Sequence, residues 1–272
     1  MALTMDFAGK HVFVFGGTTG IGFGIAENFA KHGANVSVAS RKQANVDAAT
    51  AALGTTGRSI VGVAADVRDF DAVGGAFDRA ASQLGTIDVL VSGAAGNFVA
   101  AVNAQSSNGF RAVVDIDLIG TFNVMRAAYP HLTKPGAAVI NISAPQSFIP
   151  MRYQASACAA KAGVDQLTRV LALEWGGDGV RVNSISPGPI AGTEGMRKLA
   201  SPRAAETANS AVPLGRFGTS DDIAHLAMFL ASPYASYISG ALIPCDGGGA
   251  VDSVKPMIEA AGRLAAEQAQ PQ

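Results

Sequence analysis

The chain is short of charge for a soluble protein. Asp, Glu, Lys and Arg make up 15% of its 272 residues, compared with roughly 25% in typical domains. An apolar share of 49% with so little charge excludes an intrinsically disordered chain, which needs the opposite mixture. The net charge of −1 provides no basic field, so neither nucleic acid nor a membrane is expected as a partner.

Cysteine is also scarce, with only Cys158 and Cys245. Two cysteines form no disulfide framework, and no CxxC or Cys/His spacing indicates a metal site, so no metal is expected. No run of 18 apolar residues could span a bilayer. The acidic Asp6 and the final Gln-Pro-Gln fit neither a signal peptide nor a peroxisomal address, which favours a cytoplasmic protein.

Short apolar segments alternate with helix-like segments along the chain. The strand-like segments are His11–Phe15, Asn35–Ser40, Ser59–Ala65, Ile87–Ser92, Ala137–Ser143, Val180–Ser186 and Ala241–Pro244. The helix-like segments are Ile21–Lys31, Ala44–Leu53, Ala72–Leu84, Phe110–Tyr129, Ser156–Trp175 and Asp221–Ala231. Strands that alternate with helices form a parallel sheet with helices on both faces. We therefore predict an α/β fold, a doubly wound (Rossmann) sheet of seven parallel strands.

No linker or internal repeat divides the chain, which predicts a single domain over residues 1–272. Residues 188–219 mix Pro, Gly and Thr around a possible short helix, Glu194–Leu199. A loop of this length in a compact domain is more often functional than idle, so we expect a substrate lid there. Residues 251–272 are expected to form a C-terminal tail.

Glycine, by contrast, is abundant, at 32 residues. Part of it lies in a turn after the first predicted strand, which reads Gly16-Gly17-Thr18-Thr19-Gly20-Ile21-Gly22. Such a turn lets the backbone approach a pyrophosphate and points free helix N–H groups at it. A merely structural tight turn is the alternative. The position after the first strand of a doubly wound sheet favours a dinucleotide.

The end of the second predicted strand indicates which dinucleotide binds. An acidic residue there would hold the ribose hydroxyls of NAD, whereas a cation accepts the 2′-phosphate of NADP. The chain has Ser40 and Arg41 followed by Lys42, and no acid. An arginine fork suits phosphate geometry, so NADP is predicted, with a solvated loop charge as the alternative.

Further cofactor contacts are expected after the third and fourth strands. Asp66 and Val67 follow the third strand, and Asp66 could accept a hydrogen bond from adenine. Alternatively, Asp66 caps the helix that follows. Gly93, Ala94 and Ala95 follow the fourth strand and are small enough for a ribose to lie against the backbone.

Together these segments resemble the short-chain dehydrogenase/reductase family, from about Phe7 to Gly249. The motifs are FGGTTGIG, ADV, SGAAG, DIDLIG, the INIS strand end, a helix bearing Lys161, VRVNSISPGPI and PLGRFG…DDIA…FLAS…DGGG. The resemblance implies that Lys161 contacts the cofactor, together with Pro187, Gly188 and Ile190. It also implies a homotetramer formed through the helices around Phe110–Tyr129 and Ser156–Trp175.

The catalytic pattern of that family is incomplete here. Usual members have a Tyr four residues before the Lys, a Ser thirteen before that Tyr, and an upstream Asn. This chain has Ala157, Ala144 and Asp117 at those positions. A Tyr and a Lys at i and i+4 share one helix face, where the phenol can protonate a carbonyl oxygen, and alanine cannot do this. Ordinary alcohol–ketone chemistry is therefore not expected.

One branch of the family resembles the chain at the positions where it lacks the usual catalytic residues. This branch is the 2,4-dienoyl-CoA reductases, especially the peroxisomal type. The shared stretches are Gly93–Phe98, Asp115–Asp117, Gly120–Val124 and Gly188–Gly195. The resemblance implies NADPH-dependent reduction of a conjugated diene on an acyl-CoA thioester, which requires no carbonyl proton donor.

The resemblance also suggests roles for individual side chains. The expected catalytic residues are Lys161, Asp117 and Ser143, with Asp117 and a water molecule as the acid/base relay. The expected substrate-binding residues are Asn97, Phe98, Gln146, Tyr153 and Asp246. Arg197, Lys198 and Arg203 could contact CoA phosphates or form a solvated face.

Several alternatives remain open at this point. Lys161 could bind only the cofactor ribose, Asp117 could only stabilise its own helix, and Gln146 and Tyr153 could only line the pocket wall. The chain could also be another enoyl or 3-keto reductase that uses a relocated acid such as Tyr153. It could, finally, be a catalytically silent NADP-binding protein.

Overall fold

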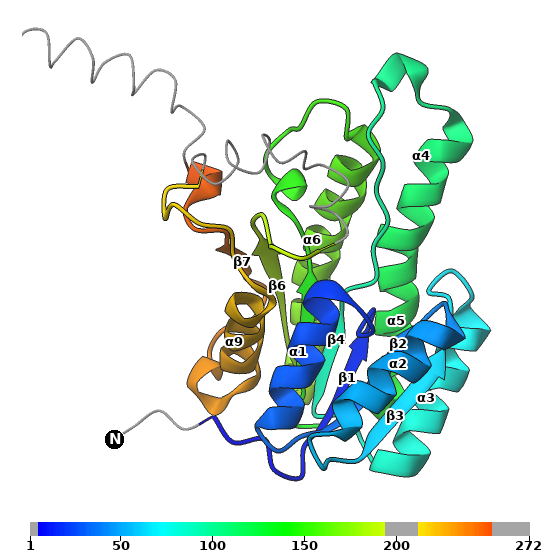
Figure 1. Cartoon of the computed structure of the whole chain (residues 1–272), viewed down its shortest axis with the longest axis vertical. Coiled ribbons are helices and arrows are strands. Elements are labelled where there is room, and N and C mark those ends of the chain that lie inside the picture. The colour runs from blue at the N-terminus through cyan, green and yellow to red at the C-terminus, as the bar shows by residue number, and fades with distance from the viewer. Residues whose placement is uncertain (1–4, 194–211, 252–272) are drawn as a thin grey trace, which may run out of the picture.

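A computed structural model describes residues 5–193 and 212–251 of the chain (Figure 1). Glu194–Leu199, Arg197, Lys198 and Arg203, most of the expected lid and nearly all of the expected tail lie outside the described residues.

Seven parallel strands form one sheet in the order β3-β2-β1-β4-β5-β6-β7, which confirms the predicted fold class. The strands are β1 His11–Phe15, β2 Asn35–Ser40, β3 Ile60–Ala64, β4 Val89–Ser92, β5 Ala138–Ile142, β6 Arg181–Pro187 and β7 Leu242–Cys245. Their short apolar runs form central strands because both faces of the sheet are covered.

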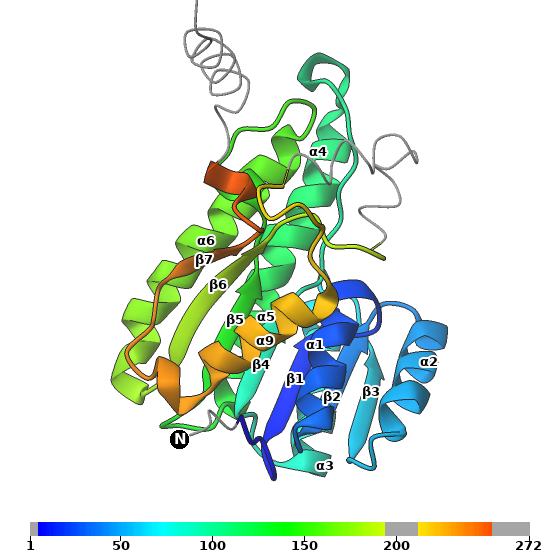
Figure 2. The same cartoon turned by 60° about the vertical axis from the view of Figure 1, so that its left-hand side comes forward.

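Helices cover the sheet in two layers. α1 (Gly20–Lys31), α2 (Gln43–Gly54) and α9 (Ser220–Ala231) lie on one face. α3 (Phe70–Leu84), α5 (Gly120–Ala128) and α6 (Ala155–Trp175) lie on the other (Figures 1 and 2). Alternate residues of β1 supply the two cores, because Val12 and Val14 pack with α1 and α9 while Phe13 and Phe15 pack with Phe77 of α3.

The helix-like segment Phe110–Tyr129 is helical throughout, but it is not one regular α-helix. The chain forms α4 (Ser107–Val114), a π-helical turn over Asp115–Ile119, and then α5. α4 and α5 continue one another past the π-helical turn (Figure 1). The turn accommodates two local contacts, a hydrogen bond from Thr121 Oγ1 to the Asp117 carbonyl (2.6 Å) and the close approach of Gly120 to Val67. A π turn inserts one residue and rotates the side chains beside it, and such turns occur often at functional sites.

The parallel arrangement brings the carboxyl ends of all the strands to one edge of the sheet. The loops after β1 and β4 diverge there, since β1 connects towards β2 and β4 towards β5. Ligands of doubly wound sheets bind in the crevice at such a switch point. Among the described helices, none is long and apolar enough to cross a membrane.

Candidate active site

The glycine-rich turn after β1 packs tightly against its surroundings. Gly16 has φ +83°, and a Cβ there would lie 2.6 Å from the backbone nitrogen of Ala94. A Cβ on Gly22 would lie 2.2 Å from the carbonyl oxygen of Gly16. Glycine at these two positions therefore lets the ends of β1 and β4 and the first turn of α1 meet.

The first turn of α1 presents backbone N–H groups without a side-chain cap from its N-cap residue. Thr19 is the N-cap residue, and its side chain makes no capping hydrogen bond. The buried Thr18 instead donates from Oγ1 to Ser40 Oγ (3.0 Å), which ties the turn to the end of β2. A Cβ on Gly20 would lie 3.8 Å from Thr193 Cγ2, an ordinary contact distance, so no described atom crowds this position. A helix N-terminus without a side-chain cap after a glycine-rich turn fits a pyrophosphate.

The residues expected to select and hold the rest of the dinucleotide lie at the same edge. Arg41 is exposed directly after β2. Asp66 accepts hydrogen bonds from its neighbour Arg68, at 3.0 Å from Nε and 2.6 Å from Nη2. The Arg68 hydrogen bond holds the pKa of the Asp66 carboxyl below its usual value. The alternative of Asp66 as a helix cap is wrong, because Asp69 caps α3 through Ala72 N–H.

Val67 and the small residues after β4 also lie where the sequence predicts. Val67 is buried against Gly120, and its carbonyl accepts from Asn123 Nδ2 (2.9 Å). Gly93 and Ala94 lie against Gly16, and Ala95 is exposed. The turns after β1, β3 and β4 thus form one continuous edge.

Asp117 and Lys161 form a buried ion pair at this edge. Asp117 Oδ2 lies 3.6 Å from Lys161 Nζ, and the two side chains are 2% and 8% exposed. Asp117 Oδ1 accepts from Gly96 N–H (2.7 Å), and Lys161 Nζ donates to the carbonyl of Ile142 (3.0 Å). The π turn, the loop after β4, the end of β5 and α6 therefore meet at two charged side chains.

Burial raises the pKa of Asp117, and the Lys161 ammonium and the Gly96 N–H oppose part of that rise. Loss of water penalises the charged carboxylate more than its neutral form. A carboxyl group in this setting is suited to holding a proton and giving it up, as an acid/base catalyst requires.

The position of the missing tyrosine lies beside this pair. Ala157 is buried on α6, one turn before Lys161. Tyr153 lies ahead of α6, is 55% exposed, and has φ +67°. Tyr153 therefore does not share the helical face of Lys161.

Three amide side chains form a cluster between the loops after β4 and β5. Asn97 Nδ2 and Gln146 Nε2 both donate to Gln154 Oε1, each at 2.8 Å. Sequence reasoning singled out Asn97 and Gln146 but missed Gln154. Its only sequence signal is its place at the start of α6, three residues before Ala157.

The other expected substrate and catalytic residues are more scattered. Phe98 is 41% exposed, and its ring lies against Gly109 of α4. The carboxylate of Asp246 accepts from Gly248 N–H (2.9 Å) and Ala250 N–H (2.7 Å) in the turn after β7. Ser143 is buried at the end of β5, and its hydroxyl has no hydrogen-bond partner in the described part of the chain.

A small hollow of about 110 Å³ lies near the end of β6, at the same edge. Gly188 and Ile190 line it together with Asp246. Pro187, the last residue of β6, is buried directly before them. These residues are close to one another.

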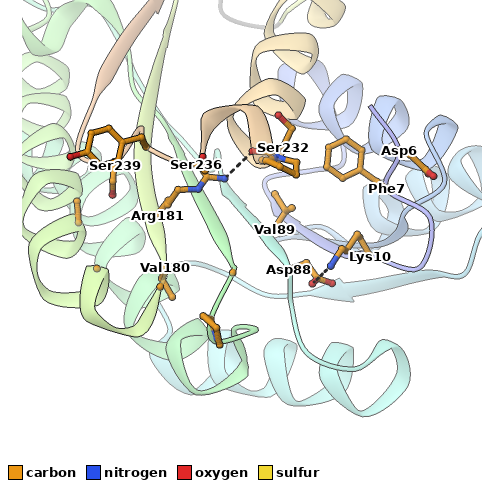
Figure 3. A pocket seen from close by; sticks show the side chains of 18 residues that line it. Asp6, Phe7, Lys10, Asp88, Val89, Val180, Arg181, Ser232, Ser236 and Ser239 are labelled. Atoms are coloured by element: carbon orange, nitrogen blue, oxygen red, sulfur yellow. Dashed lines mark hydrogen bonds and ion pairs between the residues drawn. The ribbon is translucent and has the colours of Figure 1, made fainter. Parts of the chain in front are cut away.

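A larger cavity, of about 670 Å³, lies at the opposite end of the strands (Figure 3). Lys10 and Asp88, which form an ion pair on its wall, directly precede β1 and β4, and Arg181 begins β6. Sequence reasoning did not identify this cavity. It lies away from the Asp117–Lys161 pair and takes no part in the candidate site.

Comparison with known proteins gives consistent matches. A family described as "Enoyl-(Acyl carrier protein) reductase" matches residues 16–249. The chain is 46% identical over 242 residues to a "Peroxisomal 2,4-dienoyl-CoA reductase [(3E)-enoyl-CoA-producing]" of Pongo abelii, which covers 88% of this chain and 83% of that protein. It is 38% identical over 243 residues to a "Probable 2,4-dienoyl-CoA reductase [(2E)-enoyl-CoA-producing]" of Bacillus subtilis, covering 88% and 96%.

Solved structures agree with these matches. A short chain dehydrogenase of Bacillus anthracis is 35% identical, with a TM-score of 0.79 and coverage of 89% of this chain and 96% of that chain. A dehydrogenase/reductase of Sinorhizobium meliloti is 30% identical, with a TM-score of 0.85 and coverage of 90% and 97%. The resemblance expected from the motifs is thereby confirmed.

The hydrogen bond between Asp117 and Gly96 leads to a prediction about the loop after β4. Asp117→Ala removes the acceptor, so the Gly96 amide should exchange with solvent about ten- to a hundred-fold faster, as the loss of a charge-assisted hydrogen bond implies. Asp117→Asn keeps an acceptor of the same shape and should stay within a few-fold of the wild-type rate. Hydrogen–deuterium exchange checks this, and equal rates in all three proteins would show that Asp117 does not hold the loop.

Proposed function

The chain belongs to the short-chain dehydrogenase/reductase family, and we propose that it reduces 2,4-dienoyl-CoA thioesters with NADPH. The observation that carries this proposal is the buried Asp117–Lys161 pair beside Ala157. An acid is retained at the site, while the phenol that protonates a carbonyl oxygen in ordinary members is missing. The names of the relatives from Pongo abelii and Bacillus subtilis support the same substrate class.

The residues at the carboxyl edge suit NADPH. The glycine-rich turn and the first turn of α1, which has no side-chain cap, would hold the pyrophosphate, and Arg41 would hold the 2′-phosphate. Lys161 would contact the nicotinamide ribose. When bound, the cofactor supplies a hydride to the far end of the conjugated diene.

The chain's own residues must then stabilise negative charge on the thioester oxygen and deliver a proton to carbon. Lys161 is the cation closest to Asp117 and provides the electrostatic stabilisation, with Ser143 as a nearby hydroxyl donor. Asp117 holds the proton, because burial raises its pKa, and passes it on through water. Asn97, Phe98, Gln146, Tyr153 and Asp246 would line the acyl-CoA path.

The point of protonation determines the product. A proton on the carbon next to the thioester leaves the double bond at position three, as the name of the Pongo abelii relative states, whereas a proton two carbons further on gives the product in the name of the Bacillus subtilis relative. We favour the (3E)-enoyl product because the first relative is the more similar in sequence. NMR of the product formed in deuterated water distinguishes the two.

The substrate class is tested by following NADPH absorbance with a panel of thioesters. The expected result is rapid NADPH loss with a 2,4-dienoyl-CoA and little with a 3-ketoacyl-CoA. Equal or faster reduction of the ketone would overturn the proposal.

The roles of the ion pair give a second prediction. Lys161→Ala and Asp117→Asn should each lower kcat by about a hundred-fold or more, in the range of acid–base catalysis. Tyr153→Phe is the matched control, and it should keep the full rate because Tyr153 does not face Lys161. A large loss in Tyr153→Phe would favour a relocated phenol acid instead. A wild-type protein without turnover on the whole panel would favour a silent NADP-binding protein.

The choice of cofactor gives a third prediction. Arg41→Ala should raise the KM for NADPH by about ten-fold or more, because the loss of a charge-assisted phosphate contact is worth about 1.5–3 kcal/mol. The KM for NADH, which has no 2′-phosphate, should change little. An equal change for both cofactors would assign Arg41 to a general structural role.

We also propose the homotetramer that the family resemblance implies. Large apolar side chains are exposed on the helices expected at the interface, namely Ile119, Phe122, Val170 and Leu173, and Leu173 is 84% exposed. Such surfaces are typical of subunit contacts. The cytoplasmic location stays a prediction.

This surface gives a fourth prediction. Leu173→Asp places a charge in the expected interface and should convert tetramers to smaller species in light scattering. Ala51→Asp, which alters an exposed position of α2 on the other face of the sheet, is the control and should leave the mass unchanged. A wild-type monomer would contradict the tetramer outright.

A further inference from the structure

The space between α6 and the sheet contains a layer of buried polar side chains. Such a space is usually apolar, because helices pack on a sheet through their hydrophobic faces. The layer consists of Asn141 and Ser143 on β5, Ser184 and Ser186 on β6, and Lys161, Asp165 and Thr168 on α6, and none is more than 6% exposed.

Hydrogen bonds join the half of the layer around Thr168, where Asn141 Oδ1 alone has no partner in the described part of the chain. Asn141 Nδ2 donates to Thr168 Oγ1 (2.9 Å), and Thr168 Oγ1 lies 2.8 Å from Ser184 Oγ. These bonds show that Asn141 and Ser184, which are paired in register across β5 and β6, both face α6.

The other half lies one step closer to the carboxyl edge. Side chains two residues apart on a strand share a face, so Ser143 and Ser186 also face α6. The bond from Ser143 N–H to the Ile185 carbonyl (2.8 Å) places the two residues side by side. Because α6 connects two parallel strands, it runs antiparallel to them. Asp165 precedes Thr168 by about one helical turn, so it lies closer to the carboxyl edge, at the level of Ser143 and Ser186.

The serine hydroxyls and the carboxylate of this second half have no hydrogen-bond partner among the described residues. The hydroxyls of Ser143 and Ser186 and both carboxylate oxygens of Asp165 are buried without a hydrogen bond in the described part of the chain. An unpaired buried polar group is destabilising, and an unpaired carboxylate is more so. Proteins satisfy such groups with ordered water that makes two to four hydrogen bonds, and these four polar atoms would supply enough partners for one water molecule.

The charged side chains around Lys161 indicate a function for the unpaired carboxylate of Asp165. Asp165 and Lys161 are at i and i+4 on α6, where side chains are neighbours. Asp117, on the π turn, is the other charged group that faces Lys161, while β5 and β6 contribute only neutral side chains to the layer. The remaining buried ionisable side chain of the described chain, His11, lies at the far end of β1. Whenever Asp117 takes up a proton, Lys161 therefore needs Asp165 as its counter-ion.

We propose that Asp165 is the second counter-ion of Lys161, joined to it through water held by Ser143 and Ser186. It is a positioning residue that keeps Lys161 charged and in place while Asp117 takes up and releases the proton. Only the catalytic part of this role rests on the proposed function. The proposed pairing of Asp165 with Lys161 does not require a substrate.

The first test is the pH profile of kcat with dienoyl-CoA. Asp165→Asn removes a negative charge, so both Lys161 and Asp117 should lose their protons at lower pH. The alkaline decline of kcat should then move down by about one pH unit, which corresponds to a ten-fold loss on the falling limb. Asp165→Glu, which restores the charge, should return the decline toward the wild-type position, and Asp71→Asn on the exposed face of α3 should leave it unchanged.

The second test needs no turnover and therefore separates this proposal from the proposed function. In urea unfolding, Lys161→Met should shift the midpoint less in the Asp165→Asn background than in the wild type, because the cation has already lost one of its two counter-ions there. Additive shifts, or an unmoved pH profile in an active enzyme, would overturn the proposal. If Asp165→Asn does not fold, Ser186→Ala removes one ligand of the water and should move the pH decline in the same direction by less. No movement would then contradict the proposal.

Discussion

The organisation of the carboxyl edge depends on burying one lysine and one carboxylate together. Removing either charge from water is costly, and their mutual attraction offsets that cost only when further hydrogen bonds complete the site. Here the Gly96 amide and the Ile142 carbonyl supply those bonds. The pair therefore fixes the loop after β4 and the end of β5 relative to α6. The expected substrate residues Asn97 and Gln146 lie on the loops that it fixes.

The π turn is what makes this burial geometrically possible. In a regular helix from Ser107 to Ala128, the side chain at position 117 would point in a different direction. The extra residue of the turn directs Asp117 into the protein, while Ile119 and Phe122 remain on the outside. One local irregularity thus separates the face that carries the proposed chemistry from the face proposed to contact other subunits.

Much of this could be predicted from the sequence because its signals are local. The seven strands and most helix ends follow from apolar runs, glycine turns and periodicity, and the motif around Lys161 and Asp117 identified the two central residues. The π turn left no such signal, since Asp115–Ile119 has a pattern that a regular helix would also show. Gln154 bonds Asn97, 57 residues away, and Asp165 shares a level with Ser186 only after the sheet has formed. Contacts of that kind depend on register and helix direction, which the order of residues along the chain does not reveal.

The absence of the tyrosine is better understood as a move of the proposed proton donor to another element than as the loss of a proton donor. In ordinary members the acid lies on α6, on the same helix face as the lysine, and reaches an oxygen. Here α6 contributes a buried alanine at that position, and the proposed acid, Asp117, pairs with Lys161 from the π turn. With Asp165 behind it on α6, Lys161 has carboxylates on two elements, so one of them can exchange a proton while the other maintains the charge. An acid paired with a cation that stays charged would suit the protonation of carbon, which is the step that the proposed reaction requires.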